Sequence, residues 1–137
     1  MLYTSCMRLL GIDYGTKKIG LALSDENGRF AAPLLVIPAG DQALSTVAEI
    51  CQKEGVGQIV IGKSLDYKGE ENPVYFEAER FGKLLEQATG IPIFYELEIL
   101  TTKEAERDIG KDALTDARAA ALILKSYIDQ QKNNGNR

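Results

Sequence analysis

The sequence contains no histidine, no tryptophan and only two cysteines among its 137 residues. The absence of histidine excludes catalysis by Ser-His-Asp or Cys-His arrangements. The two cysteines, Cys6 and Cys51, form no CxxC motif and cannot supply the four ligands of a typical zinc site. We therefore expect any catalytic chemistry to depend on Asp, Glu, Lys, Tyr or Cys side chains.

Long hydrophobic runs and a secretion signal are also missing. No apolar stretch reaches the ~18 residues that a membrane-spanning helix needs, and the opening MLYTSCM has no basic segment followed by an apolar one. With both cysteines expected to be reduced, these features predict a cytoplasmic protein without a membrane partner. The net charge of −4 argues mildly against a general affinity for nucleic acid, but it permits a local basic surface.

The hydrophobic pattern predicts one domain over residues 1–137, built from alternating elements. Short turns join the first three strands and favour antiparallel neighbours. Strands are expected at 7–13, 18–24, 29–37, 58–62 and 91–97; helices are expected at 41–54, 73–89, 101–109 and 115–131. Asp41 and Thr115 are the expected N-caps of the first and last helices, and 132–137 the expected frayed tail. The pattern indicates an α/β fold with a mixed five-stranded sheet flanked by helices.

Acidic residues stand where these elements begin or end. Asp13 ends the first strand, Glu96 and Glu98 lie at the end of the strand at 91–97, and Asp116 opens the last helix. Converging carboxylates repel one another, and Mg²⁺ or Mn²⁺ relieves that repulsion because both ions prefer oxygen ligands. Such ions can activate a water for phosphodiester hydrolysis. Glu96 and Glu98 share one face of their strand, so either could be the middle ligand.

Simpler roles remain open for several of these residues. Asp13 could accept hydrogen bonds from the backbone of the turn at Tyr14, and Lys17 and Lys18 could be ordinary charges of a hairpin. Asp25 is expected to stabilise the turn in DENG.

The segment LLGIDYGTKKIGLALSD resembles the opening of the YqgF/RuvX family, Holliday-junction-resolvase-like proteins of the RNase H-like superfold. The segments IVIGKSLDYKG, LTTKEAE and TDARAAALILKSYI resemble later motifs of that family, in the same order. The resemblance implies an RNase H-like fold and a metal-dependent nuclease that matures the 5′ end of 16S ribosomal RNA or acts on branched DNA. Met7 stands where the family usually starts, so residues 1–6 are expected to be a leader.

By position, the resemblance implies that Asp13, Glu98 and Asp116 are the catalytic acids and hold Mg²⁺ or Mn²⁺. The expected nucleic-acid contacts are Lys17, Lys18 and Lys103 on phosphates and Tyr14 stacked on a base. The expected partner is pre-ribosomal RNA or branched DNA, bound by a monomer or a weak homodimer.

The chain departs from the family pattern beside Glu98. The family usually has an aspartate before this glutamate and an arginine after it, whereas this chain has Leu97 and Ile99. The alternative function is therefore a catalytically weakened nucleic-acid- or ribosome-associated binding protein of the same fold. A kinase related to actin, suggested by Asp13-x-Gly-Thr, needs two such domains, and the length predicts one.

Overall fold

The computed structural model describes residues 7–64, 73–98 and 114–135. At 63–64, 73, 97–98 and 133–135 it describes the backbone only. The strands are β1 (Arg8–Tyr14), β2 (Lys18–Ser24), β3 (Ala31–Pro38), β4 (Val56–Ser64) and β5 (Ile93–Glu98). The helices are α1 (Ala43–Glu54), α2 (Pro73–Thr89) and α4 (Thr115–Gly135).

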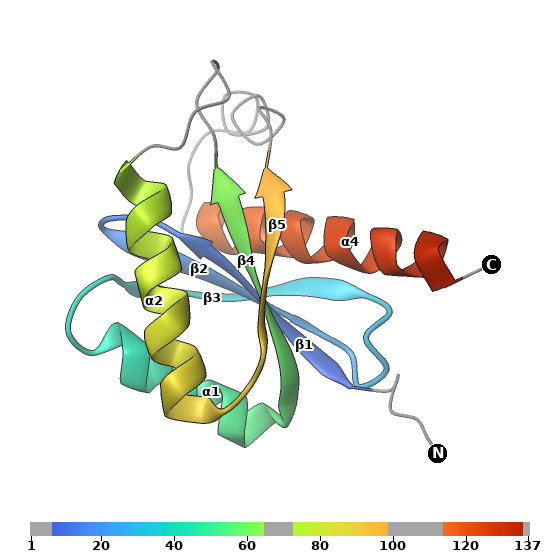
Figure 1. Cartoon of the computed structure of the whole chain (residues 1–137), viewed down its shortest axis with the longest axis horizontal. Coiled ribbons are helices and arrows are strands. Elements are labelled where there is room, and N and C mark those ends of the chain that lie inside the picture. The colour runs from blue at the N-terminus through green and yellow to red at the C-terminus, as the bar shows by residue number, and fades with distance from the viewer. Residues whose placement is uncertain (1–6, 65–72, 99–113, 136–137) are drawn as a thin grey trace.

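The five strands form one sheet in the order β3-β2-β1-β4-β5 (Figure 1). β1 and β2 pair antiparallel, as do β2 and β3, whereas β4 pairs parallel with both β1 and β5. This arrangement confirms the predicted antiparallel meander followed by parallel β–α units. The parallel strands β1, β4 and β5 end at the same edge of the sheet, so Asp13 and Glu98 come to that edge from opposite sides of β4.

Helices cover both faces of the sheet, α1 and α2 on one side and α4 on the other (Figure 1). Because side chains alternate along a strand, β1 sends Leu10 and Ile12 toward α1 and α2, and Leu9 toward α4. On the α4 face, Leu9 packs in one cluster with Val60 and Leu124. A carboxylate on the α4 face of β1 is therefore placed beside that helix.

Several element boundaries differ from the sequence prediction by a few residues, and three of the differences concern helix ends. The N-cap of α1 is Gln42 rather than Asp41, and its side chain makes no capping hydrogen bond. Thr115 is the first helical residue of α4 rather than its cap, because the Arg118 amide already donates to the carbonyl of Leu114. α4 also continues to Gly135, beyond the predicted end at residue 131. The predicted helix at 101–109 lies outside the described residues.

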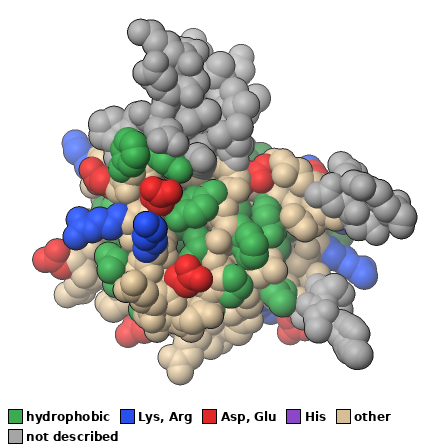
Figure 2. Space-filling view, in the orientation of Figure 1, with side chains coloured by type: hydrophobic (Ala, Val, Ile, Leu, Met, Phe, Trp, Pro, Cys, Tyr) green, Lys and Arg blue, Asp and Glu red, His purple; other side chains and the backbone are tan. Residues whose placement is uncertain are grey.

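Apolar side chains are also exposed on the face that carries α2 and β5 (Figure 2). The exposed large ones on these two elements are Phe76, Leu84, Phe94 and Tyr95. β5 is one edge of the sheet, and the other edge strand, β3, carries Pro33 and Pro38, which discourage pairing with a further strand. Within the described ranges, no helix is long and apolar enough to cross a membrane.

Candidate active site

Asp13 lies on the face of β1 that α4 covers. Its neighbours on that face show this: Leu9 packs with α4, and a Cβ added at Gly11 would lie 2.9 Å from the carbonyl oxygen of Ala120. Asp13 follows at the next position of the same alternation, and it is half-buried. The sequence thus ends a buried strand with a carboxylate that faces the helix.

Gly20 brings the start of α4 close to Asp13. Gly20 is the antiparallel partner of Asp13 in β2. A Cβ at Gly20 would overlap the carbonyl oxygen of Asp116 and lie 2.8 Å from the amide nitrogen of Ala117. The backbone of the first turn of α4 therefore rests directly on β2 beside Asp13, and only glycine leaves room for it.

Asp116 is half-buried in that first turn. The positive end of the helix dipole favours a carboxylate at this place. The structure therefore brings Asp13 and Asp116, 103 positions apart in the sequence, to the two sides of Gly20, and their roles as catalytic acids and metal ligands stay predictions.

The environment of Glu96 does not suit a metal ligand beside Asp116. Its carboxylate is 5% exposed and accepts hydrogen bonds from Ser126 Oγ at 2.6 Å and from Gln130 Nε2 at 2.7 Å. Ser126 follows Asp116 by roughly 15 Å along the helix at 1.5 Å per residue. Glu96 is therefore bound to the second half of α4, away from Asp116.

Glu98 is the last residue of β5, and its backbone pairs in register with Ser64 of β4. The structure describes only the backbone of Glu98, so its role as a metal ligand stays a prediction. Among the side chains that the structure does describe, no three acidic or cysteine groups lie together in a way that would hold a metal ion. The two carboxylates beside Gly20 offer oxygen atoms alone, which suits Mg²⁺ or Mn²⁺ better than zinc.

The predicted nucleic-acid contacts fall into three groups. Lys17 and Lys18 are exposed where β1 turns into β2, directly after the strand that carries Asp13. Tyr14 lies on the opposite face of the sheet, where its ring packs against Phe81 with centroids 5.3 Å apart. Lys103, like Ile99, lies outside the described residues.

The packing of Tyr14 also affects the pKa of its hydroxyl group. Burial raises the pKa of the Tyr14 hydroxyl, and the nearby carboxylate of Glu77 raises it further. These contacts give the ring a structural role in the core between β1 and α2. Stacking of Tyr14 on a base stays a prediction.

The comparison with protein families agrees with this geometry. The family model described as "RuvX: Holliday junction resolvase" matches residues 7–130. The chain belongs to the RuvX family. A relative from Limosilactobacillus fermentum, named "Putative pre-16S rRNA nuclease", is 37% identical over 90% of this chain and 94% of its own length. A relative of the same name from Syntrophus aciditrophicus is 38% identical over 90% of this chain and 89% of its own.

Solved structures share the fold of this RuvX-family chain. The Thermus thermophilus RuvC in complex with a Holliday junction substrate superposes with a TM-score of 0.60 and 17% identity, covering 92% of this chain and 96% of that one. The fowlpox virus Holliday junction resolvase gives a TM-score of 0.56 and 14% identity, covering 90% of this chain and 99% of that one. The RNase H-like architecture expected from the sequence is thereby confirmed.

The sequence pattern did not predict two features of the α4 face. The first is the buried contact of Glu96 with Ser126 and Gln130, which the sequence could not reveal because it joins residues at least 30 positions apart. The second is the steric requirement for Gly11 and Gly20. A signal for it was present: both glycines interrupt apolar strands, and the last helix opens with the small residues of ARAAA.

Proposed function

We propose that this RuvX-family protein is a metal-dependent endonuclease that cleaves structured nucleic acid, and that its substrate is the 5′ end of pre-16S ribosomal RNA. The observation that supports the proposal most is the placement of Asp13 and Asp116 on the two sides of Gly20. The names of the relatives point to the same RNA.

In this proposal Asp13, Glu98 and Asp116 hold Mg²⁺ or Mn²⁺. The ion would lower the pKa of a bound water and stabilise the departing oxygen of the phosphodiester. The chain supplies the rest: the two aspartates are fixed in position by β1 and by the first turn of α4. Lys17 and Lys18, exposed at the following turn, would attract the phosphates of the strand on either side of the cleaved bond.

The test is cleavage of a pre-16S fragment that carries its 5′ leader, with Mn²⁺ or Mg²⁺, by the wild type and by Asp13→Asn and Asp116→Asn. Asp129→Asn is the matched control, because Asp129 is an exposed carboxylate on the same helix, paired with Lys125 at 3.1 Å. Loss of a ligand should reduce cleavage about 100-fold or more, whereas the control should cleave as the wild type does. Calorimetric titration with Mn²⁺ should show weaker binding in the two site variants.

Two further arms sharpen the result. A synthetic four-way DNA junction offered in parallel tests RNA against branched DNA as the substrate. Glu98→Gln compared with Glu96→Gln tests which glutamate is the ligand: we expect the first to abolish cleavage and the second to preserve it, because a glutamine at 96 can still accept both hydrogen bonds. Metal-independent binding of RNA without cleavage, equal in the wild type and in Asp13→Asn, would contradict the nuclease and favour the binding protein.

A further inference from the structure

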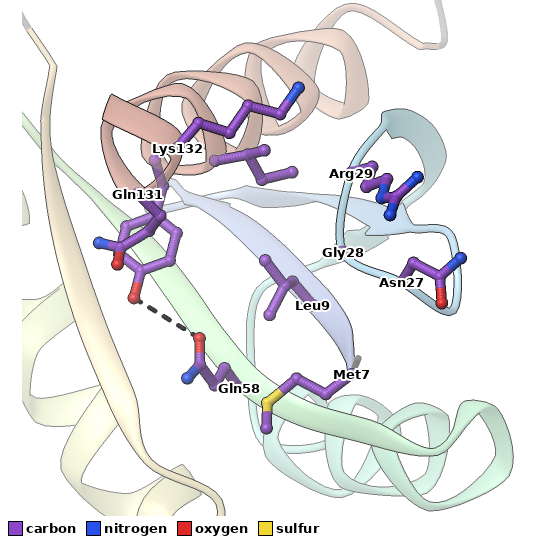
Figure 3. Close-up of a pocket in the computed structure, with 10 residues that line it drawn as sticks. Met7, Leu9, Asn27, Gly28, Arg29, Gln58, Gln131 and Lys132 are labelled. Carbon is purple, nitrogen blue, oxygen red and sulfur yellow. Dashed lines mark hydrogen bonds between the residues drawn. The ribbon is translucent and has the colours of Figure 1, made fainter. Parts of the chain in front are cut away.

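A second concave site lies at the opposite end of the α4 face, where β1 and β4 begin (Figure 3). Its volume is about 440 Å³, within the range of pockets that hold small molecules, roughly 300–1,000 Å³. The turn between β2 and β3 forms one wall and the last turns of α4 form the other (Figure 3). We call it the hairpin pocket and define it by Leu9, Asn27, Arg29, Gln58, Tyr127 and Lys132.

The charge of the hairpin pocket is opposite to that of the whole chain. The sequence has 20 acidic and 16 basic residues, yet among the described residues that line the pocket only Arg29 and Lys132 are charged. They come from opposite walls, Arg29 from the turn and Lys132 from the helix (Figure 3). Of the ion pairs between described residues, none includes either of them. Two cations that face one concave space favour a phosphate there.

The floor of the pocket suits a flat, polar-edged group. Leu9 is 6% exposed and contributes an apolar surface. The Tyr127 hydroxyl donates to the Gln58 side-chain oxygen at 3.5 Å, which leaves the Gln58 amide nitrogen as the end that a ligand's acceptor can use. Asn27 adds a second side-chain amide from the turn. An apolar floor, amide groups and cations on the rim match the base and the phosphate of one nucleotide.

A row of cations leads along α4 to the hairpin pocket. Arg118, Lys125 and Lys132 recur at seven-residue intervals on α4, and all three are exposed. Seven residues are nearly two helical turns, so the three side chains lie along one stripe of the helix. The stripe ends at the pocket, roughly 21 Å from Arg118 at 1.5 Å per residue. It follows the side of α4 that is turned away from Asp116, because side chains two residues apart on a helix point to nearly opposite sides.

We propose that the hairpin pocket binds one unpaired nucleotide of the nucleic-acid substrate, on a single strand that reaches the pocket along this stripe. The inference rests on the proposed function insofar as the ligand is nucleic acid. The pocket would then select substrates with an unpaired extension a few nucleotides from the cleaved bond, a property that the acids beside Gly20 cannot supply.

The experiment measures binding in EDTA, so it does not depend on cleavage. Fluorescence anisotropy compares an RNA hairpin that carries a six-nucleotide unpaired extension with the same hairpin lacking it. The test variant is Arg29→Ala/Lys132→Ala. The matched control is Arg80→Ala/Lys83→Ala, which removes the same two residue types from the exposed face of α2, across the sheet.

We expect the wild type and the control to bind the extended hairpin more tightly and the test variant to lose that preference, by roughly tenfold at 0.1 M salt. The slope of log Kd against log salt should fall by about 1.4 for the extended hairpin, since each contact on a single strand contributes about 0.7. An extension without bases should bind the wild type no better than the bare hairpin.

An unchanged preference in the test variant would overturn the inference. So would an equal benefit from the extension without bases, because the pocket would then contact phosphate alone. Failure of the nuclease proposal is distinguishable, since it would abolish cleavage while leaving the binding preference and its loss intact. Both pocket side chains are exposed, so the melting temperature of the test variant should match that of the wild type.

Discussion

The two halves of α4 are attached to the sheet in different ways. The first turn contacts β2 through its backbone, where the Asp116 carbonyl lies against Gly20. The second half is held by side chains: Ser126 and Gln130 donate to the buried Glu96, and Tyr127 packs in the core of that face. The absence of a side chain at Gly20 therefore positions Asp116, which has a proposed catalytic role. Hydrogen bonds from two donors hold Glu96, which has a structural role.

This difference separates two acids that look alike in the sequence. Asp13 and Glu96 both lie on the α4 face, toward the carboxyl ends of β1 and β5, the two strands that pair in parallel with β4. Asp13 lies beside the half of α4 that approaches by backbone contact, and it is half-buried, whereas Glu96 is buried under side chains. The way in which the helix packs on each strand decides which acid stays partly exposed to solvent.

The largest effect should come from Gly20→Ala. The added methyl group meets backbone atoms of Asp116 and Ala117, which cannot move without shifting the whole first turn of α4. We expect a loss of roughly 3 kcal/mol in the free energy of unfolding, a melting temperature about 10 °C lower, and loss of nuclease activity. Chemical denaturation and the cleavage assay measure the two effects.

Gly57→Ala is the matched control for Gly20→Ala. A Cβ at Gly57 in β4 would meet the Met7 side chain, with the sulfur 2.8 Å away, and a flexible methionine can move aside. We expect this variant to lose less than about 1 kcal/mol and to retain activity. Equal destabilisation by the two substitutions would show that the contact with α4 is not what makes Gly20 necessary.

Glu96→Ala should have the second largest effect. It leaves Ser126 and Gln130 without their acceptor under the helix, which costs about 1–3 kcal/mol for the unpaired polar groups. Glu96→Gln should lose less than about 1 kcal/mol, because its side-chain oxygen can still accept from both. Urea denaturation of the two variants checks this ordering, and a glutamine variant as unstable as the alanine variant would contradict it.

Much of the fold was predictable because it depends on local patterns. The apolar runs that became β1 and β2 alternate with turns whose residues fix short antiparallel connections, so the meander was expected and is confirmed. Asp25 is another example of a local pattern. Its carboxylate accepts hydrogen bonds from the backbone amides of Arg29 at 2.7 Å and Phe30 at 3.1 Å, as the turn chemistry in DENG predicts. Helix caps were predicted less well, since Asp41 and Thr115 each miss the observed cap by one residue.

The candidate site was predictable only in part, because its geometry depends on contacts across the sheet. Strand ends and helix starts indicated Asp13 and Asp116 without any structure. No local pattern could tell Glu96 from Glu98, which share a strand face. The distinction comes from Ser126, thirty positions away, whose hydroxyl donates to Glu96. Sequence periodicity places a residue on a face, whereas the helix that packs there decides what the residue does.

Removing a single hydroxyl from the second half of α4 should have a smaller effect. Tyr127→Phe removes the donor to Gln58, a long contact of 3.5 Å, and leaves the buried ring in place. We expect a loss of about 0.5 kcal/mol, measured by urea denaturation. A loss above about 2 kcal/mol would show that the hydroxyl, rather than the Glu96 contact, anchors this half of the helix.

The smallest effect concerns the Asp25 turn, which ends in the wall of the hairpin pocket. The backbone amides of Phe30 and Arg29 lower the pKa of the Asp25 carboxyl below its ordinary value of 3.8. A carboxyl whose folded pKa is lowered stabilises the fold above its unfolded pKa, and that stability is lost as the pH falls through the lower, folded value. The stability difference between the wild type and Asp25→Asn should therefore be constant near pH 7 and shrink once the pH falls below 3.8.

Denaturation midpoints of both proteins across this range, with the Asp25 carboxyl followed by NMR, measure the effect. A folded pKa at or above 3.8 would contradict it. Because the hydrogen bonds of the Asp25 carboxylate are exposed to solvent, the effect should also be weakened by salt. The loosened part would be the turn that carries Arg29, which lines the hairpin pocket, while the contact between Gly20 and Asp116 involves no charge and should persist. Acid below pH 3.8 should thus weaken binding of the unpaired extension before it disturbs the position of the first turn of α4.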